Sequence, residues 1–249
     1  MSEYDLDSGP DPADRAAAAP EQRHENAVPA VGIGPGNLAY LTPRGRRAIA
    51  EADVVVGFES VVEFVADVIE GEALTCGYRD EAETLSAFGD RVAAGEDGTA
   101  VAMGDPNHSG YQFVGKVEAA VERPVEVIPG ISSLQIAASR ARTPMEDSRF
   151  VTLHKSGDIS ADLDRIRAVA GDRHLLVLPR PYDWMPEDIA ADLLDSGVAG
   201  GLDALVLEHL THDEETITRT ALADLAEQTT ETEQESPFSD LSVFVLRAD

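Results

Sequence analysis

Three short runs of glycine, proline and polar residues hold the groups best suited to chemistry in this sequence. Each run comes directly after a stretch of small or β-branched apolar residues, which is typical of a strand. The runs are Gly34-Pro35-Gly36, Met103 to Gly110 and Ile128 to Ser133. Because the carboxyl ends of parallel strands meet at one edge of an α/β sheet, where ligands bind, we expect the runs to line one site.

The first run nearly matches a dinucleotide-binding turn, which requires Gly-x-Gly-x-x-Gly and an acidic residue about 20 positions further on. Counted from Gly32, the third glycine falls at Gly36, one place early, and Asn37 holds the required position. Pro35 has no backbone N–H to offer a phosphate. Asp53 fits a ribose contact or the solvated start of the next strand. The run therefore disfavours hydride chemistry, although another ligand could approach it closely.

The charge of the chain is strongly negative: 47 acidic and 19 basic residues give −28, and the only lysines are Lys116 and Lys155. Such self-repulsion destabilises a compact protein in dilute buffer, whereas molar salt confines it to short range. We therefore expect a protein of halophilic type. A nucleic acid would meet a negative surface, so we expect no nucleic-acid partner.

Other sequence features narrow the compartment and exclude several kinds of site. Cys76 is the single cysteine, which excludes an internal disulfide and favours a reducing cytoplasm. His209 and His212 have no third ligand at metal-site spacing, so we expect no metal. Residues 1–27 contain no apolar core of a signal peptide and predict a disordered acidic tail. No apolar run is long enough to span a membrane.

The remaining sequence alternates strand-like and helix-like segments, which predicts a largely parallel sheet with helices on its faces. Expected strands cover 28–33, 54–56, 100–103 and 125–128, with helices over 43–51, 81–94, 111–122 and 131–140. After a break at residues 142–144, expected strands cover 150–153, 175–178, 204–208, 216–219 and 242–246, with helices over 159–169, 186–194 and 221–228 and a loop over 229–236. We expect two α/β domains, 28–143 and 144–249, and a ligand cleft between them.

The motifs Gly-Ile-Gly-Pro-Gly-Asn, Leu-Thr-Pro, Ala-Asp-Val-Val-Val-Gly, Gly-Asp-Pro and Pro-Gly-Ile-Ser-Ser occur here in an order that resembles the tetrapyrrole methylase family. The resemblance runs from about Val28 to the C-terminus. Residues 37–43, 52–57 and 206–214 most resemble the branch that methylates carbon 5 of precorrin-7 or cobalt-precorrin-7. The implied fold is that of class III methyltransferases, with two α/β domains and a cofactor cleft between them.

The resemblance also implies S-adenosylmethionine as methyl donor, a tetrapyrrole substrate and a homodimer. In the family the donor contacts the proline of the first turn, the Gly-Asp-Pro loop, the residues after Pro-Gly-Ile and part of the second half. The cofactor-binding residues carried over are Pro35, Met103, Gly104, Asp105, His108, Ser132, Ser133, Leu178 and Pro179.

Methyl transfer to an electron-rich ring carbon needs no nucleophile from the protein, so positioning and desolvation supply most of the rate. Asp105 is the candidate catalytic residue, either orienting the substrate or accepting a proton; the alternative is that it caps the following turn. The carboxylates of a tetrapyrrole would suit cations near the cleft. The candidate cations are Arg142, Arg149, Lys155 and Arg180.

Some positions depart from the family pattern. Residues 152–156 stand where relatives tend to have a His-Gly pair, and Asn107 to Tyr111 shift the tyrosine and glycine that often follow Gly-Asp-Pro. Two alternatives therefore stay open. One is another methylase of this family, acting on a different ring position or resembling diphthine synthase; the other is a nucleotide-binding module without catalysis.

Overall fold

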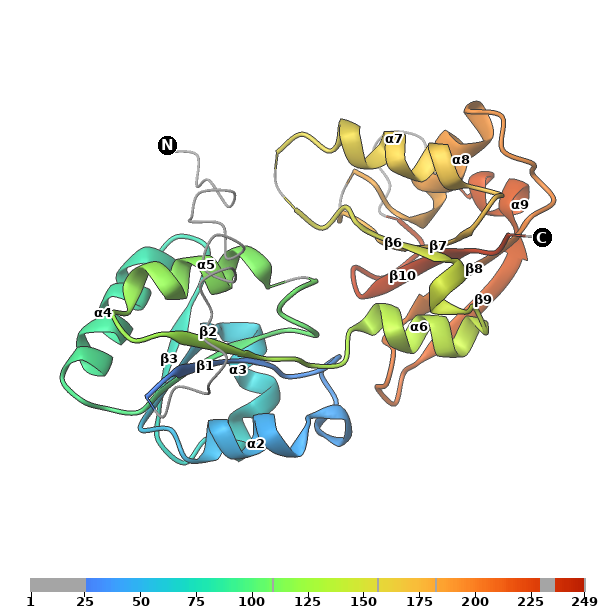
Figure 1. Ribbon diagram of the computed structural model, residues 1–249. Helices are drawn as coiled ribbons and strands as arrows, with labels where there is room; N and C mark the ends of the chain where they lie inside the picture. The colour runs from blue at the N-terminus through green and yellow to red at the C-terminus, as the bar shows by residue number, and fades with distance from the viewer. Residues whose placement is uncertain (1–25, 109, 156, 182, 229–235, 249) are drawn as a thin grey trace. The chain divides into compact units, whose positions relative to one another are not determined.

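The computed structural model describes residues 26–108, 110–155, 157–181, 183–228 and 236–248, and the chain divides after Ser132 into two compact units. Each unit is built on its own five-stranded sheet (Figure 1). The tail expected over 1–27 and the loop expected over 229–236 lie almost wholly outside the described residues. None of the described helices is long and apolar enough to cross a membrane.

The first sheet is entirely parallel, in the order β3-β2-β4-β1-β5. Its strands are β1 (Val28–Gly32), β2 (Val54–Phe58), β3 (Glu72–Cys76), β4 (Gly98–Ala102) and β5 (Val125–Ile128). The connecting helices are η1 (Leu38–Tyr40), α2 (Pro43–Ala50), α3 (Glu59–Val65), η2 (Ala66–Val68), α4 (Glu81–Ala93) and α5 (Tyr111–Ala120).

Helices cover both faces of this sheet: α2 and α3 lie on one side and α4 and α5 on the other (Figure 1). Successive strand residues point to opposite faces, so Val55 joins the core cluster under α2 and α3, whereas Val54 and Val56 join the one under α4 and α5. Both faces are therefore apolar, as a fully covered parallel sheet requires.

The second sheet has the order β6-β7-β10-β8-β9, and only the β6–β7 pair is parallel. Its strands are β6 (Ser148–Thr152), β7 (His174–Leu178), β8 (Asp203–Glu208), β9 (Thr216–Ala221) and β10 (Ser242–Leu246). The helices of this unit are α6 (Ser133–Ala141), η3 (Met145–Asp147), α7 (Ser160–Val169), α8 (Pro186–Asp195) and α9 (Leu222–Ala226).

The fold confirms two α/β halves and differs from the sequence prediction in detail. The second sheet is mostly antiparallel because β8 and β9 join through a short turn and β10 inserts between β7 and β8. Strand β3 and helix α3 were not predicted. The sequence-based division after residue 143 placed α6 with the first half, whereas α6 packs against β7 and β10 of the second sheet.

Candidate functional site

Two of the glycine turns meet at the carboxyl edge of the first sheet. Gly34, after β1, donates its N–H to the carbonyl oxygen of Gly104, after β4, at 3.2 Å, and the N–H of Gly104 donates to the carbonyl of Gly34 at 2.8 Å. Both residues have positive φ, 85° and 65°, a region that glycine adopts without steric cost. The pairing fixes the first turn against the Gly-Asp-Pro loop.

Gly130, which follows β5, closes the same edge. A Cβ atom on Gly130 would lie 2.1 Å from the carbonyl oxygen of Gly104 and 2.6 Å from that of Gly32. A Cβ atom on Gly32 would lie 2.5 Å from the Gly104 oxygen. Three main-chain segments therefore touch with no room for a side chain between them, and the three runs meet as the sequence predicted.

Asp105 holds the Gly-Asp-Pro loop in its turn. Its Oδ1 accepts from the backbone N–H of Asn107 at 2.8 Å and from the Asn107 side-chain amide at 3.1 Å. Its carbonyl accepts from the N–H of His108 at 2.9 Å. The capping role is thus present in the structure, and it leaves a half-buried carboxylate at the ligand edge.

His108 is half-buried beside this carboxylate. Burial lowers the pKa of His108 below its usual value, with the charge of Asp105 opposing the shift. The imidazole is therefore neutral at pH 7. A neutral ring beside a carboxylate suits a cationic ligand such as a sulfonium, because it adds no like charge.

The other residues of this edge that the sequence analysis assigned to binding the methyl donor are partly or fully buried. Pro35 and Met103 are half-buried, and Ser132 is buried, with 5% of the residue exposed. Ser133 is the first residue of α6, in the second unit.

In the second unit, Leu178 and Pro179 stand at the end of β7, with Leu178 half-buried and Pro179 buried. Strands β6, β7 and β8 run in the same direction, so their carboxyl ends share one edge of the sheet. The segments that follow them, beginning at Leu153, Pro179 and His209, lie along that edge.

Two of the four candidate cations are already paired. Lys155 Nζ lies 2.5 Å from Oδ2 of Asp162, whose side chain is 8% exposed. Arg180 grips Asp183 with two hydrogen bonds, of 2.7 and 2.6 Å. Arg142 and Arg149 are exposed and form no ion pair with any described residue. They are therefore the cations of this set available to a carboxylate.

The turn after β8 has a strained backbone and is held by hydrogen bonds to Glu215. His209 and Thr211 have φ of 48° and 74°, and a β-branched residue such as Thr211 rarely adopts this region. Oε2 of Glu215 accepts from the Thr211 N–H at 2.7 Å, and Oε1 of Glu215 accepts from Nε of Arg140 on α6 at 2.6 Å. One carboxylate thus joins the turn to α6.

His209 and His212, the pair that the sequence analysis considered as metal ligands, belong to this turn. No metal-binding group of three or more His, Cys, Asp or Glu occurs among the described residues.

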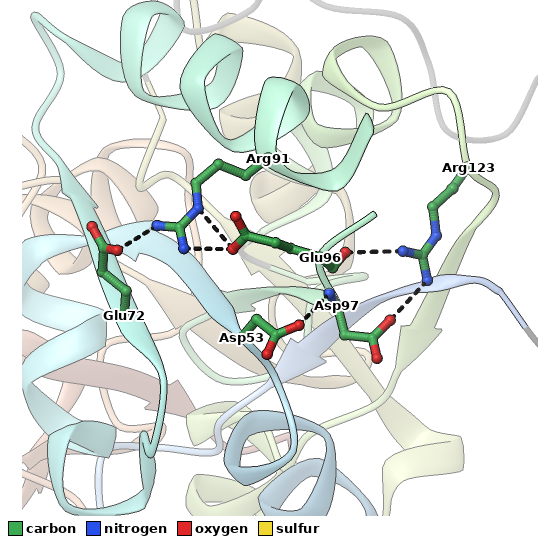
Figure 2. A network of polar contacts seen from close by, with 6 residues as sticks. All are labelled: Asp53, Glu72, Arg91, Glu96, Asp97 and Arg123. Carbon is green, nitrogen blue, oxygen red and sulfur yellow. Dashed lines mark hydrogen bonds and ion pairs between the residues drawn. The ribbon is translucent and has the colours of Figure 1, made fainter. Parts of the chain in front are cut away.

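The opposite edge of the first sheet is occupied by a network of ion pairs and hydrogen bonds (Figure 2). Arg91 binds Glu72 at 2.6 Å, and Nη1 and Nη2 of Arg123 bind the carbonyl of Glu96 at 3.0 Å and Oδ1 of Asp97 at 3.3 Å. Oδ2 of Asp53 accepts from the Asp97 N–H at 2.9 Å.

Asp53 therefore lies where strands β2 and β4 begin, a strand length away from the glycine turns, so the ribose interpretation of this residue is wrong. Asp53 immediately precedes β2, which agrees with the alternative interpretation.

Cys76 ends β3 at the ligand edge and is buried. Burial raises its pKa to about 11, and its thiol donates to the carbonyl of Gly57 at 3.5 Å. The group is a thiol at neutral pH and is not an activated nucleophile.

Comparisons with known proteins agree with this architecture. The pattern of the tetrapyrrole (corrin/porphyrin) methylases matches residues 27–226. The chain belongs to this family. Its members are methyltransferases that use S-adenosylmethionine, and this methylase is an enzyme of that kind.

Individual relatives are distant. The chain is 28% identical to a probable cobalt-precorrin-7 C(5)-methyltransferase of Methanocaldococcus jannaschii, over 88% of this chain and 97% of that protein. It is 30% identical to a probable cobalt-factor III C(17)-methyltransferase of Methanothermobacter thermautotrophicus, over 61% of this chain but only 44% of that protein. The crystal structure of a cobalt precorrin-4 methyltransferase superposes with a TM-score of 0.69 at 20% identity, covering 92% and 98% of the two chains.

The glycine edge of this methylase fits a donor with a sulfonium and an adenosyl group. Its polar groups are mainly main-chain amides and carbonyls, the one nearby imidazole is neutral, and Asp105 contributes a negative charge. No local sequence pattern indicates the contact between Glu215 and Arg140, because these residues are 75 positions apart in the chain.

Proposed function

We propose that this methylase transfers a methyl group to carbon 5 of precorrin-7 or cobalt-precorrin-7 in cobalamin biosynthesis. The observation that carries the proposal is the meeting of Gly34, Gly104 and Gly130 at one edge of the first sheet. A relative that matches this chain over nearly its full length is a probable cobalt-precorrin-7 C(5)-methyltransferase. A different ring position is the second candidate, because a C(17)-methyltransferase is comparably identical.

The proposed donor contacts are Pro35, Met103, Gly104, Asp105, His108, Ser132, Ser133, Leu178 and Pro179. When bound, S-adenosylmethionine would supply its sulfonium methyl group to a ring carbon of the substrate, with neutral S-adenosylhomocysteine as the leaving group. Main-chain groups of the glycine turns orient the donor, and Asp105 balances its positive charge. We propose Asp105 as the catalytic residue, which orients the substrate or accepts a proton; its link to Asn107 fixes the carboxylate for either role.

Arg142 and Arg149 are proposed to bind substrate carboxylates, and the active form is proposed to be a homodimer in a salt-rich cytoplasm. Light scattering of the purified chain should give about twice the 26.5 kDa mass of one chain. A single-chain mass under conditions of full activity would exclude the dimer.

Mass spectrometry of cobalt-precorrin-7 incubated with the protein and S-adenosylmethionine in molar potassium chloride tests the reaction. We expect a gain of one methyl group, with carbon 5 identified by carbon-13 NMR using a labelled donor. Asp105→Ala should lose at least about 100-fold in rate, the usual scale for removing one catalytic electrostatic or acid–base group. Asp90→Ala, an exposed acid on α4, is the matched control and should keep full activity.

A methyl group at another carbon would move the assignment to a different ring position. No methylation by a protein that binds the donor would reject this substrate. Unchanged activity of Asp105→Ala would leave this residue only its capping role.

A further inference from the structure

The turn between β3 and α4 presents an aromatic side chain and a cation at the ligand edge of the first sheet. Tyr78 and Arg79 are its two central residues and are both exposed, Tyr78 by 57%. The N–H of Gly77 donates to Oδ1 of Asp80 at 2.7 Å and closes the turn. The side chain of Asp80 therefore holds the turn closed, with Tyr78 and Arg79 exposed at its tip.

The Tyr78 ring packs against the Phe58 ring, which in turn packs against the Phe113 ring. Its centroid lies 5.2 Å from that of Phe58, and the Phe58 centroid lies 5.7 Å from that of Phe113. Both distances are in the range of favourable tilted aromatic pairs. Phe58 ends β2, and Phe113 is in the first turn of α5, directly after the Gly-Asp-Pro loop. The row of rings thus runs from the turn toward the glycine edge.

A largely buried ion pair joins α4, which follows the turn, to α5, which carries Phe113. Lys116 Nζ of α5 lies 2.7 Å from Oε2 of Glu81, the first residue of α4, with side chains 15% and 3% exposed. Breaking such a pair leaves an uncompensated buried charge, so separating the two helices would cost free energy. The exposed tyrosine therefore stands on a rigid base.

Arg79 is a cation without an ion pair among the described residues. The neighbouring carboxylate of Asp80 is engaged by Gly77 instead. In a chain with a net charge of −28, an exposed guanidinium beside an aromatic face is suited to a flat ligand with acidic groups, because arginine binds carboxylates with two parallel hydrogen bonds.

We propose that Tyr78 and Arg79 form a binding surface for the tetrapyrrole substrate, with the tyrosine ring against the face of the macrocycle and the guanidinium on one of its peripheral carboxylates. This inference rests on the proposed function for its substrate class. The turn after β3 and the loop after β4 are two strand spacings apart, about 10 Å. A macrocycle of four rings can reach from Tyr78 toward the donor turns over this span.

Binding measurements separate substrate contacts from donor contacts. Fluorescence anisotropy of uroporphyrin III, a stable tetrapyrrole with eight carboxylates, reports macrocycle binding, and calorimetry with S-adenosylhomocysteine reports the donor site. We expect Tyr78→Ala to weaken porphyrin binding about tenfold and Tyr78→Phe to change it little, since stacking uses the ring face. Arg79→Gln should weaken it about threefold or more, and Arg79→Lys should restore part of the loss. All four variants should bind S-adenosylhomocysteine as the parent does.

Arg47→Gln on α2 and Ile217→Ala on β9 are matched controls, since both side chains are exposed and lie outside the proposed surface. Porphyrin binding that is unchanged in Tyr78→Ala and Arg79→Gln would overturn the inference and leave the proposed function intact. Failure of the parent protein to bind the porphyrin while it binds S-adenosylhomocysteine would overturn both the inference and the proposed tetrapyrrole substrate on which it rests.

Discussion

At the scale of single residues, the glycine turns can touch only because their glycines have no Cβ atom. Gly130 allows the β5 turn to lie against the carbonyls of Gly104 and Gly32, where a Cβ atom would be 2.1 and 2.6 Å away. The obstructing atoms are main-chain oxygens, which cannot rotate aside. Gly130→Ala should therefore separate the turns, weaken S-adenosylhomocysteine binding by at least tenfold in calorimetry and lower the unfolding free energy by about 1–3 kcal/mol.

Gly201→Ala provides the control for this substitution, because a Cβ atom there meets nothing within 4 Å. It should leave donor binding unchanged and stability within about 0.5 kcal/mol, as is usual for surface positions. Normal donor affinity in a folded Gly130→Ala protein would mean that the glycine contact is not needed for the donor site.

At the scale of elements, the sequence identifies segments whose pattern comes from their own burial. Val54-Val55-Val56 are buried on both faces and predict β2, and Pro43 in the first turn predicts the start of α2. Strand β3 escaped prediction because it is an edge strand with mostly exposed residues, so it lacks apolar alternation. The positions of Tyr78 beside Phe58 and of Arg140 beside Glu215 depend on the tertiary fold, which no local pattern contains.

The link between α6 and the β8–β9 turn gives a prediction at this scale. Glu215→Gln removes the charge that Arg140 and the Thr211 N–H share, and it should lower the unfolding free energy at pH 7 by about 1–2 kcal/mol. The hydrogen bonds from Arg140, the largest cause, hold the pKa of Glu215 below its ordinary value of 4.5. This contribution is therefore complete above pH 4.5 and is lost as the pH falls through the folded-state pKa.

Urea unfolding of the parent and of Glu215→Gln between pH 7 and pH 3.5 measures the difference. The gap between the two proteins should narrow as the pH falls below 4.5. The exposed neighbour Glu214, changed to Gln, is the control and should show no comparable gap. A gap that persists unchanged at pH 3.5 would show that the stabilisation does not come from the carboxylate charge.

At the scale of the whole molecule, acidic residues greatly outnumber basic ones. Both lysines of the chain pair with carboxylates that are nearly buried, Lys116 with Glu81 and Lys155 with Asp162. Among the described residues, most exposed acids form no ion pair. The net charge of the chain is −28. The folded state should therefore gain stability whenever the repulsion between these acids is screened.

Potassium chloride tests this property directly, because the screening length falls from about 10 Å at 0.1 M to about 3 Å at 1 M. We expect the thermal midpoint to rise by about 5–10 °C between 0.1 and 2 M salt, which corresponds to a few kcal/mol for a protein of this size. A triple variant, Glu51→Gln, Glu63→Gln and Asp90→Asn, removes three exposed charges; it should start from a higher midpoint and gain less from salt. If parent and variant rise equally, the salt acts through stronger burial of apolar surface and not through the acidic surface.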